Sequence, residues 1–366
     1  MNKTDTLSFP SAQKLEWLQA LRGIAALMVL FYHLWPHWDK NPFLTHLVPV
    51  TKWGFSGVDV FFVLSGLVVS MTAEHLYEGA DALRFFYRRA IRIYLGYWPA
   101  LLLTVLVFGL LYGANYPADQ RAFSSLLLLS FWPDDHWLGT AWTLSFELYF
   151  YVGTALLVCF CKTPNRPKVL GIVFALVALW NAALMFGNKS AFIGGVQPLR
   201  MWMAAYIMEF VAGALLASYR QHIKWHPVLA LIAISLAAMS AAVGTFSEWF
   251  DRIEVLRVGT FGIAAAMLVL LAIMLQAKKT HQPPRWLVTI GDSSYSLYLL
   301  HTALIATLYL ILDKLHITNF YAILLCEILM PCISIALAIA WYRLIERPLY
   351  RWGIQTLLPK KSHGRV

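Results

Sequence analysis

The apolar stretch from Leu18 to Trp35 carries two side chains that can do chemistry, Arg22 near its start and His33 near its end. The stretch is long enough to cross a bilayer as a helix. At about 1.5 Å per residue, Arg22 and His33 are separated by about 16 Å along the helix axis. If the arginine lies at one interface, the histidine reaches the middle of the membrane or slightly beyond. His33 is therefore a candidate functional residue, and a neutral histidine that hydrogen-bonds a neighbouring helix is the alternative.

Asp59 is a candidate partner for this histidine. It lies near the start of the second apolar stretch, in the segment GVDVFFVLSG. Because the first two stretches are consecutive and antiparallel, a hydrogen bond between Asp59 and His33 is geometrically accessible, and it would raise the basicity of the imidazole. Capping of its own helix near the interface is an equally good interpretation of Asp59.

Two further apolar segments carry polar side chains at comparable depth. Glu147, in WTLSFELYFY, is expected about 9 Å from the outer face of the membrane. In SYSLYLLH, Ser294, Tyr298 and His301 follow at steps of four and three, so they share one helix face. His301 reaches about the depth of His33. We therefore expect two histidines and two carboxylates to converge in the outer half of the membrane.

A group of arginines precedes the third apolar stretch. Arg84, Arg88 and Arg92 recur every four residues and would form one helix face, with Arg89 beside it. The guanidinium group is a planar bidentate donor that matches phosphate oxygens. The pattern indicates a phosphate-binding surface, or a basic surface that binds anionic lipid head groups.

Composition places the chain among polytopic membrane proteins. Of 366 residues, 60% are hydrophobic and only 13% are charged, and the apolar stretches are spread along the whole length. The four cysteines lie in or beside apolar segments without metal-type spacing, so no disulfide framework and no metal site is expected. The net charge of +10 requires no nucleic acid, because its location follows membrane topology.

We predict an all-α bundle of about ten transmembrane helices in a single domain, residues 1–366. The expected spans are 18–35, 55–73, 94–112, 142–161, 168–187, 200–217, 227–245, 258–276, 288–312 and 320–342. The apolar segment 123–132 is too short to cross, so we expect it to be re-entrant or interfacial. With ten crossings, 21 of the 29 lysines and arginines lie on the side of the termini, which predicts cytoplasmic termini.

Six motifs in this order resemble those of the membrane-bound acyltransferase family 3, over residues 17–350. They are Arg22 and His33 with ten residues between them, GVDVFFVLSG, the pair Arg89 and Arg92, WTLSFELYFY, SYSLYLLH and Glu346-Arg347-Pro348. This chain departs from the family pattern in two respects. The fourth motif often has a second acid where this chain has Leu148. Some members also carry an esterase-like extracytoplasmic domain, which is not expected here.

The resemblance implies an O-acyltransferase of the bacterial cytoplasmic (inner) membrane. Its donor would be an acyl-CoA, commonly acetyl-CoA, and its acceptor would be a glycan or glycolipid. The protein would be surrounded by membrane lipids and could form a homo-oligomer. No metal and no nucleic acid are implied. The implied residues are His33, Asp59, Glu147 and His301 for catalysis, Arg22, Arg88, Arg89 and Arg92 for the donor, and Ser294 and Tyr298 for substrate.

Both the catalytic route and the class of protein have alternatives at this point. His33 acts as a general base within a ternary complex, or a protein group is transiently acylated and passes the acyl group on. A proton-coupled transporter or a lipid or glycan flippase is the rival class, because such proteins also bury acids and histidines. Transporters are commonly built from inverted repeats, and the sequence contains no such symmetry.

Overall fold

The computed structural model describes residues 15–77, 79–112, 121–187, 203–245, 253–278 and 281–358. Within these ranges the regular elements are all helical, and no strand occurs. The longer helices are α1 (Glu16–Trp38), α3 (Gly57–Ala73), α4 (Gly79–Tyr112), α6 (Trp142–Phe160), α7 (Arg166–Gly187), α10 (Tyr206–Tyr219), α11 (Pro227–Thr245), α13 (Ile263–Lys278), α15 (Ser294–Lys314) and α16 (Phe320–Trp341). The shorter ones are α2 (Val48–Thr51), α5 (Arg121–Leu127), α12 (Glu254–Arg257), α14 (Arg285–Asp292) and α17 (Arg347–Thr356).

The fold is that of an all-α multi-pass membrane protein, as predicted. Eight helical segments of the described chain are long and apolar enough to cross a bilayer. They coincide with eight of the ten expected spans. The other two spans correspond to α10, with 14 residues, and α11, with 19. The count of ten crossings stays a prediction.

Several boundaries differ from the expectation. The third span was expected from residue 94, but α4 begins at Gly79, because the arginine-rich segment continues the same helix. The ninth span is interrupted at Ser293, where α14 ends and α15 begins. The segment 123–132 overlaps the short helix α5, which ends at Leu127. The last carbonyls of α5 accept hydrogen bonds from side chains of α4, among them the Tyr97 hydroxyl at 2.7 Å from Ser125 O.

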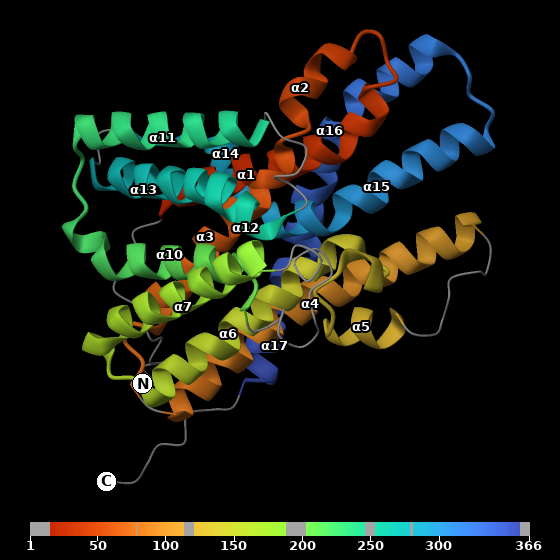
Figure 1. Cartoon of the computed structure of the whole chain (residues 1–366). Coiled ribbons are helices and arrows are strands. Elements are labelled where there is room, and N and C mark those ends of the chain that lie inside the picture. The colour runs from red at the N-terminus through yellow and green to blue at the C-terminus, as the bar shows by residue number, and fades with distance from the viewer. Residues whose placement is uncertain are drawn as a thin grey trace.

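Helix α1 lies at the centre of the bundle. It packs against α3, α13, α14 and α15, and so it contacts elements from both halves of the chain. Figure 1 shows α11 and α13 on one side of the molecule, α4 and α6 running obliquely to them, and α15 and α16 leaving the bundle as a pair beside the end of α1. The two candidate residues of α1 therefore face different neighbours.

Helices α3 and α10 cross in close contact through two glycines. A Cβ on Gly66 would collide with the carbonyl oxygen of Phe210, and a Cβ on Gly213 would collide with that of Val63. Each glycine thus allows the opposite backbone to approach, as small residues do in membrane helix pairs. This crossing fixes the rotation of α3, and with it the placement of the polar side chains of that helix.

We predict that Gly66→Ala lowers the stability of the protein by about 1–3 kcal/mol, because the added methyl group has to displace backbone. The measurement is the midpoint of thermal unfolding in detergent. Gly153→Ala, in α6, is the matched control, because no atom lies within 4 Å of its added Cβ. That variant is expected to be neutral or slightly stabilising. Equal midpoints for the two variants would contradict the assigned crossing.

Candidate active site

The two histidines predicted to reach the same depth are in contact. Their ring centroids are 4.7 Å apart, and His301 Nε2 lies 3.1 Å from His33 Nδ1. His33 belongs to α1 and His301 to α15, and their helices pack side by side. His301 is only 1% exposed, whereas His33 is partly accessible.

Backbone carbonyl groups determine which nitrogens of the pair carry hydrogen. His33 Nδ1 lies 2.9 Å from the Val29 carbonyl oxygen, and His301 Nδ1 lies 3.0 Å from that of Leu297. A carbonyl oxygen only accepts, so each Nδ1 has to donate. His301 Nε2 is then the acceptor for His33 Nδ1–H. This arrangement satisfies all three contacts and leaves the lone pair of His33 Nε2 unused by the pair.

A cavity of about 110 Å³ is lined by most of the arginines that were predicted to bind the donor. Arg22, Arg89 and Arg92 line it together with a single acid, Glu147. Glu346 also acts electrostatically on Arg22 and Arg92, so three cations lie against two carboxylates, and the remaining positive charge makes this cavity suitable for an anionic group. Arg89 also donates to the Thr72 hydroxyl at 2.8 Å, which orients its guanidinium group.

The arginine cavity is elongated along α3. Its lining extends from Val69 at one end of that helix to Val58 near the other, which corresponds to about 16 Å of helix. Ser294 and Tyr298 line it as well, so the predicted substrate residues do share this space. The Ser294 hydroxyl is fully buried and has no hydrogen-bond partner among the described residues. It is therefore available to a bound molecule.

A second cavity, of about 500 Å³, begins at His33. Along α15 it starts at Thr302, only four residues after Tyr298 of the arginine cavity, which is about 6 Å of helix. His301 lies between these two positions and packs against Tyr298 with ring centroids 6.0 Å apart. The Tyr298–His301–His33 contact thus forms the partition between two cavities.

The cavity contains only part of the expected arginine group. Arg88 was expected to share a surface with Arg84 and Arg92, but it is exposed and does not line the cavity. The cavity face contains Arg89 and Arg92, which are three residues apart, because the neighbouring helices pack on that side of α4. The spacing of the arginines in the sequence is compatible with either face of the helix lining a cavity.

Glu147 is also placed differently from the expectation. Instead of joining the histidines, it lies in the arginine cavity and accepts a hydrogen bond from the Tyr151 hydroxyl. A depth along α6 does not determine which helices surround the side chain, and α6 packs against α3 and α4, which carries the arginines. Glu147 can therefore balance charge among the arginines.

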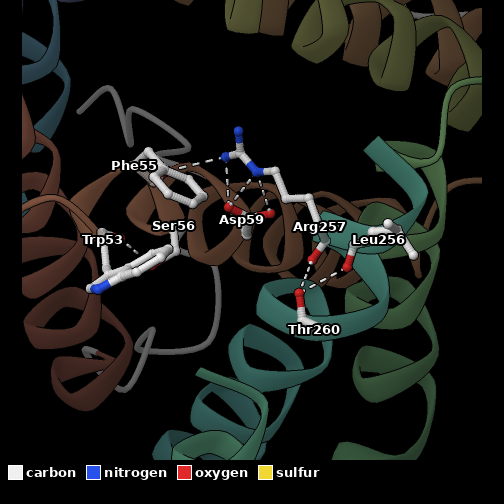
Figure 2. Close-up of polar contacts among 7 residues, drawn as sticks. All are labelled: Trp53, Phe55, Ser56, Asp59, Leu256, Arg257 and Thr260. Carbon is white, nitrogen blue, oxygen red and sulfur yellow. Dashed lines mark hydrogen bonds and ion pairs between the residues drawn. The ribbon is translucent and has the colours of Figure 1, made fainter. Parts of the chain in front are cut away.

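Asp59 does not contact His33. It is fully buried and pairs with Arg257, whose Nε lies 3.0 Å and whose Nη2 lies 2.7 Å from the carboxylate oxygens. Figure 2 shows the guanidinium group above Asp59, with a further bond from Arg257 Nη2 to the Phe55 carbonyl oxygen at 3.2 Å. The expected hydrogen bond between Asp59 and His33 is thus replaced by a bidentate ion pair.

Arg257 was missed because it immediately precedes an apolar stretch, where an interfacial position is the ordinary interpretation. It is only 7% exposed. The backbone changes to a wide π turn over Val258–Gly262 directly after it, and such turns re-aim the side chains beside them. Glu209 is buried in the same cluster, where it interacts electrostatically with Asp59 and Arg257.

A second π turn, Tyr342–Glu346, serves the arginine cavity. Glu346 accepts a hydrogen bond from the Ser296 hydroxyl at 2.5 Å, and it interacts electrostatically with Arg22 and Arg92. The sequence singled out this glutamate only as part of a motif. No signal in the local pattern indicates that the end of α16 returns to the start of α1.

The fold and the two cavities define a multi-pass membrane protein that encloses an arginine-lined cavity beside a histidine pair. The chain belongs to the family described as Acyltransferase domain, the acyltransferase 3 family, which matches residues 15–341. This membership makes it an acyltransferase.

Relatives agree with this assignment. The chain is 29% identical to the exopolysaccharide production protein ExoZ of Rhizobium meliloti (strain 1021), over 82% of this chain and 90% of that protein. It is 26% identical to the O-acetyltransferase OatA of Staphylococcus aureus (strain NCTC 8325 / PS 47), over 98% of this chain. The match spans 62% of the length of OatA. No solved structure matches the chain.

Proposed function

We propose that this acyltransferase moves an acetyl group from acetyl-CoA to a hydroxyl group of an envelope glycan or glycolipid. Family membership and the names of the relatives support transfer to polysaccharide. The observation that carries the proposal is the pair of cavities on opposite sides of one partition, which contains His33 and His301. A donor and an acceptor entering from opposite sides would meet at that partition.

The arginine cavity is the proposed donor site. Arg22, Arg89 and Arg92 would bind phosphate groups of the donor, and the elongated space along α3 would hold its flexible arm. The excess of basic residues on the side of the termini supports a cytoplasmic entrance, where acyl-CoA is available. The end of this space at Tyr298 would bring the thioester to the histidine pair.

His33 is the proposed general base. A sugar hydroxyl is a weak nucleophile at neutral pH, so removal of its proton by a positioned imidazole accelerates attack. His33 Nε2 would take this proton as the hydroxyl oxygen bonds to the thioester carbon. When the carbon–sulfur bond breaks, the coenzyme A thiolate leaves and takes a proton from the imidazolium. His301 would hold His33 in the reactive tautomer by accepting its Nδ1–H.

The donor site is tested by binding. We expect Arg89→Ala to weaken acetyl-CoA binding by about 10- to 100-fold, because a hydrogen bond to a charged group contributes about 1.5–3 kcal/mol. Arg89→Lys should rescue only part of this loss, since the bidentate geometry is not restored. The measurement is the dissociation constant of acetyl-CoA with purified protein in nanodiscs.

Arg88→Ala is the matched control, because Arg88 is the neighbouring arginine on α4 but is exposed and outside the cavity. Its donor affinity should equal that of the unmodified protein. Equal effects of Arg88→Ala and Arg89→Ala would show that only the general basic charge of α4 matters, and would refute the donor site.

A further inference from the structure

The cavity that begins at His33 continues into a neighbouring hollow of about 460 Å³. Both spaces are lined by His37, Tyr309 and Asp313, so they form one groove between the end of α1, α15 and α16. We call it the α15–α16 groove. Its lining extends along α15 from Thr302 to Asp313, which corresponds to about 16 Å. The groove is open and long compared with a single small molecule.

An aromatic pair lies in the middle of this groove. The rings of His37 and Tyr309 are stacked with centroids 3.6 Å apart and planes within 10° of each other. His37 follows His33 by one helical turn, so both side chains point from the same face of α1. Flat aromatic surfaces with polar edges bind molecules that are apolar on one face and polar at the rim. A pyranose ring has this character.

A buried carboxylate lies beside the aromatic pair. Glu327 is 3% exposed and lines the groove. It accepts hydrogen bonds from Asn41 Nδ2 at 2.7 Å and from the Tyr309 hydroxyl at 3.0 Å. Both donors are neutral groups, and a carboxylate offers about four acceptor positions. Glu327 can therefore accept further hydrogen bonds, and hydroxyl groups are suitable donors.

We propose that the α15–α16 groove is the acceptor subsite and binds a sugar ring of a glycan. The ring would lie against the His37–Tyr309 pair and donate a hydroxyl hydrogen bond to Glu327. A neighbouring hydroxyl would then reach His33, one turn along α1. This inference rests on the proposed function, because it assigns the acceptor of that reaction. It distinguishes a sugar from the acyl chain of a lipid, which needs no buried carboxylate.

The test uses purified protein in nanodiscs with radiolabelled acetyl-CoA. The acceptor probe is envelope polysaccharide from a deletion strain of the source bacterium, freed of O-acetyl groups with mild base. We expect His37→Ala and Tyr309→Ala each to raise the half-saturating concentration of polysaccharide about 2- to 10-fold, because an aromatic contact contributes about 0.5–1.5 kcal/mol. Their acetyl-CoA dissociation constants should be unchanged, which also reports that the variants are folded.

Two further variants sharpen the result. Leu310→Trp fills the groove without removing a polar group, and it should raise the half-saturating concentration even if an alanine variant fails to fold. Tyr321→Ala is the matched control, because this tyrosine of α16 is 74% exposed and does not line the groove. It should behave like the unmodified protein.

The outcomes separate the two proposals. Unmodified protein that transfers no label to the polysaccharide would refute the proposed function and the acceptor subsite together. Normal transfer with unchanged half-saturation in His37→Ala, Tyr309→Ala and Leu310→Trp would overturn the subsite alone. Label found only on lipids that carry no sugar would also overturn the subsite.

Discussion

His33→Ala is expected to lose acyl transfer by at least about 100-fold, the effect typical of removing a general base. The variant should still insert, purify and bind acetyl-CoA. Its imidazole makes two hydrogen-bonding contacts through Nδ1, and a hydrogen bond inside a membrane bundle contributes only about 1 kcal/mol. The measurements are the transfer rate to envelope polysaccharide, the acetyl-CoA dissociation constant and the unfolding midpoint in detergent.

His46→Ala is the matched control, because this histidine is exposed in the segment between α1 and α3. It should retain full activity. His301→Ala should lose less activity than His33→Ala, since His301 orients the proposed base and does not line the groove. If His33→Ala stayed active while His301→Ala did not, the base would be His301. Full activity of both His33→Ala and His301→Ala would contradict the proposed mechanism.

Helix periodicity and hydropathy were sufficient to predict eight helices that are long and apolar enough to span, and the position of each side chain along its own helix. This is why His33 and His301, on two helices that were expected to run in the same direction, could be expected at the same level. The structure places them in contact. Their roles in catalysis stay predictions.

Periodicity does not determine how a helix is rotated or which helix is its neighbour. Asp59 could face His33 or another partner, and the choice is made by the packing of α3 against α10 and α13. Arg257 enters the bundle beside a π turn, which has no clear sequence signal. The position of Glu147 depends likewise on the packing of α6 against α3 and α4, and that of Glu346 on the return of the chain after α16.

The buried pair of Asp59 and Arg257 leads to the second large expected effect. Asp59→Ala and Arg257→Ala should each destabilise the protein by about 3–5 kcal/mol, because each leaves the other charge buried without its partner. The measurement is the unfolding midpoint in detergent, with donor affinity as a second readout. Arg121→Ala, which removes an exposed arginine at the start of α5, is the control and should leave the midpoint unchanged.

A double variant separates this structural role from a catalytic one. Replacing the pair by apolar residues, Asp59→Val with Arg257→Met, should recover most of the stability, because a buried ion pair is often matched by apolar side chains of similar volume. If Asp59 serves mainly to fix α3 against α12, transfer should return with the fold. If Asp59 instead acted on His33, Asp59→Ala would lose transfer at an unchanged midpoint while Arg257→Ala stayed active. That result would contradict the ion pair as the main role of Asp59, and would restore the hydrogen bond to His33 that the sequence alone suggested.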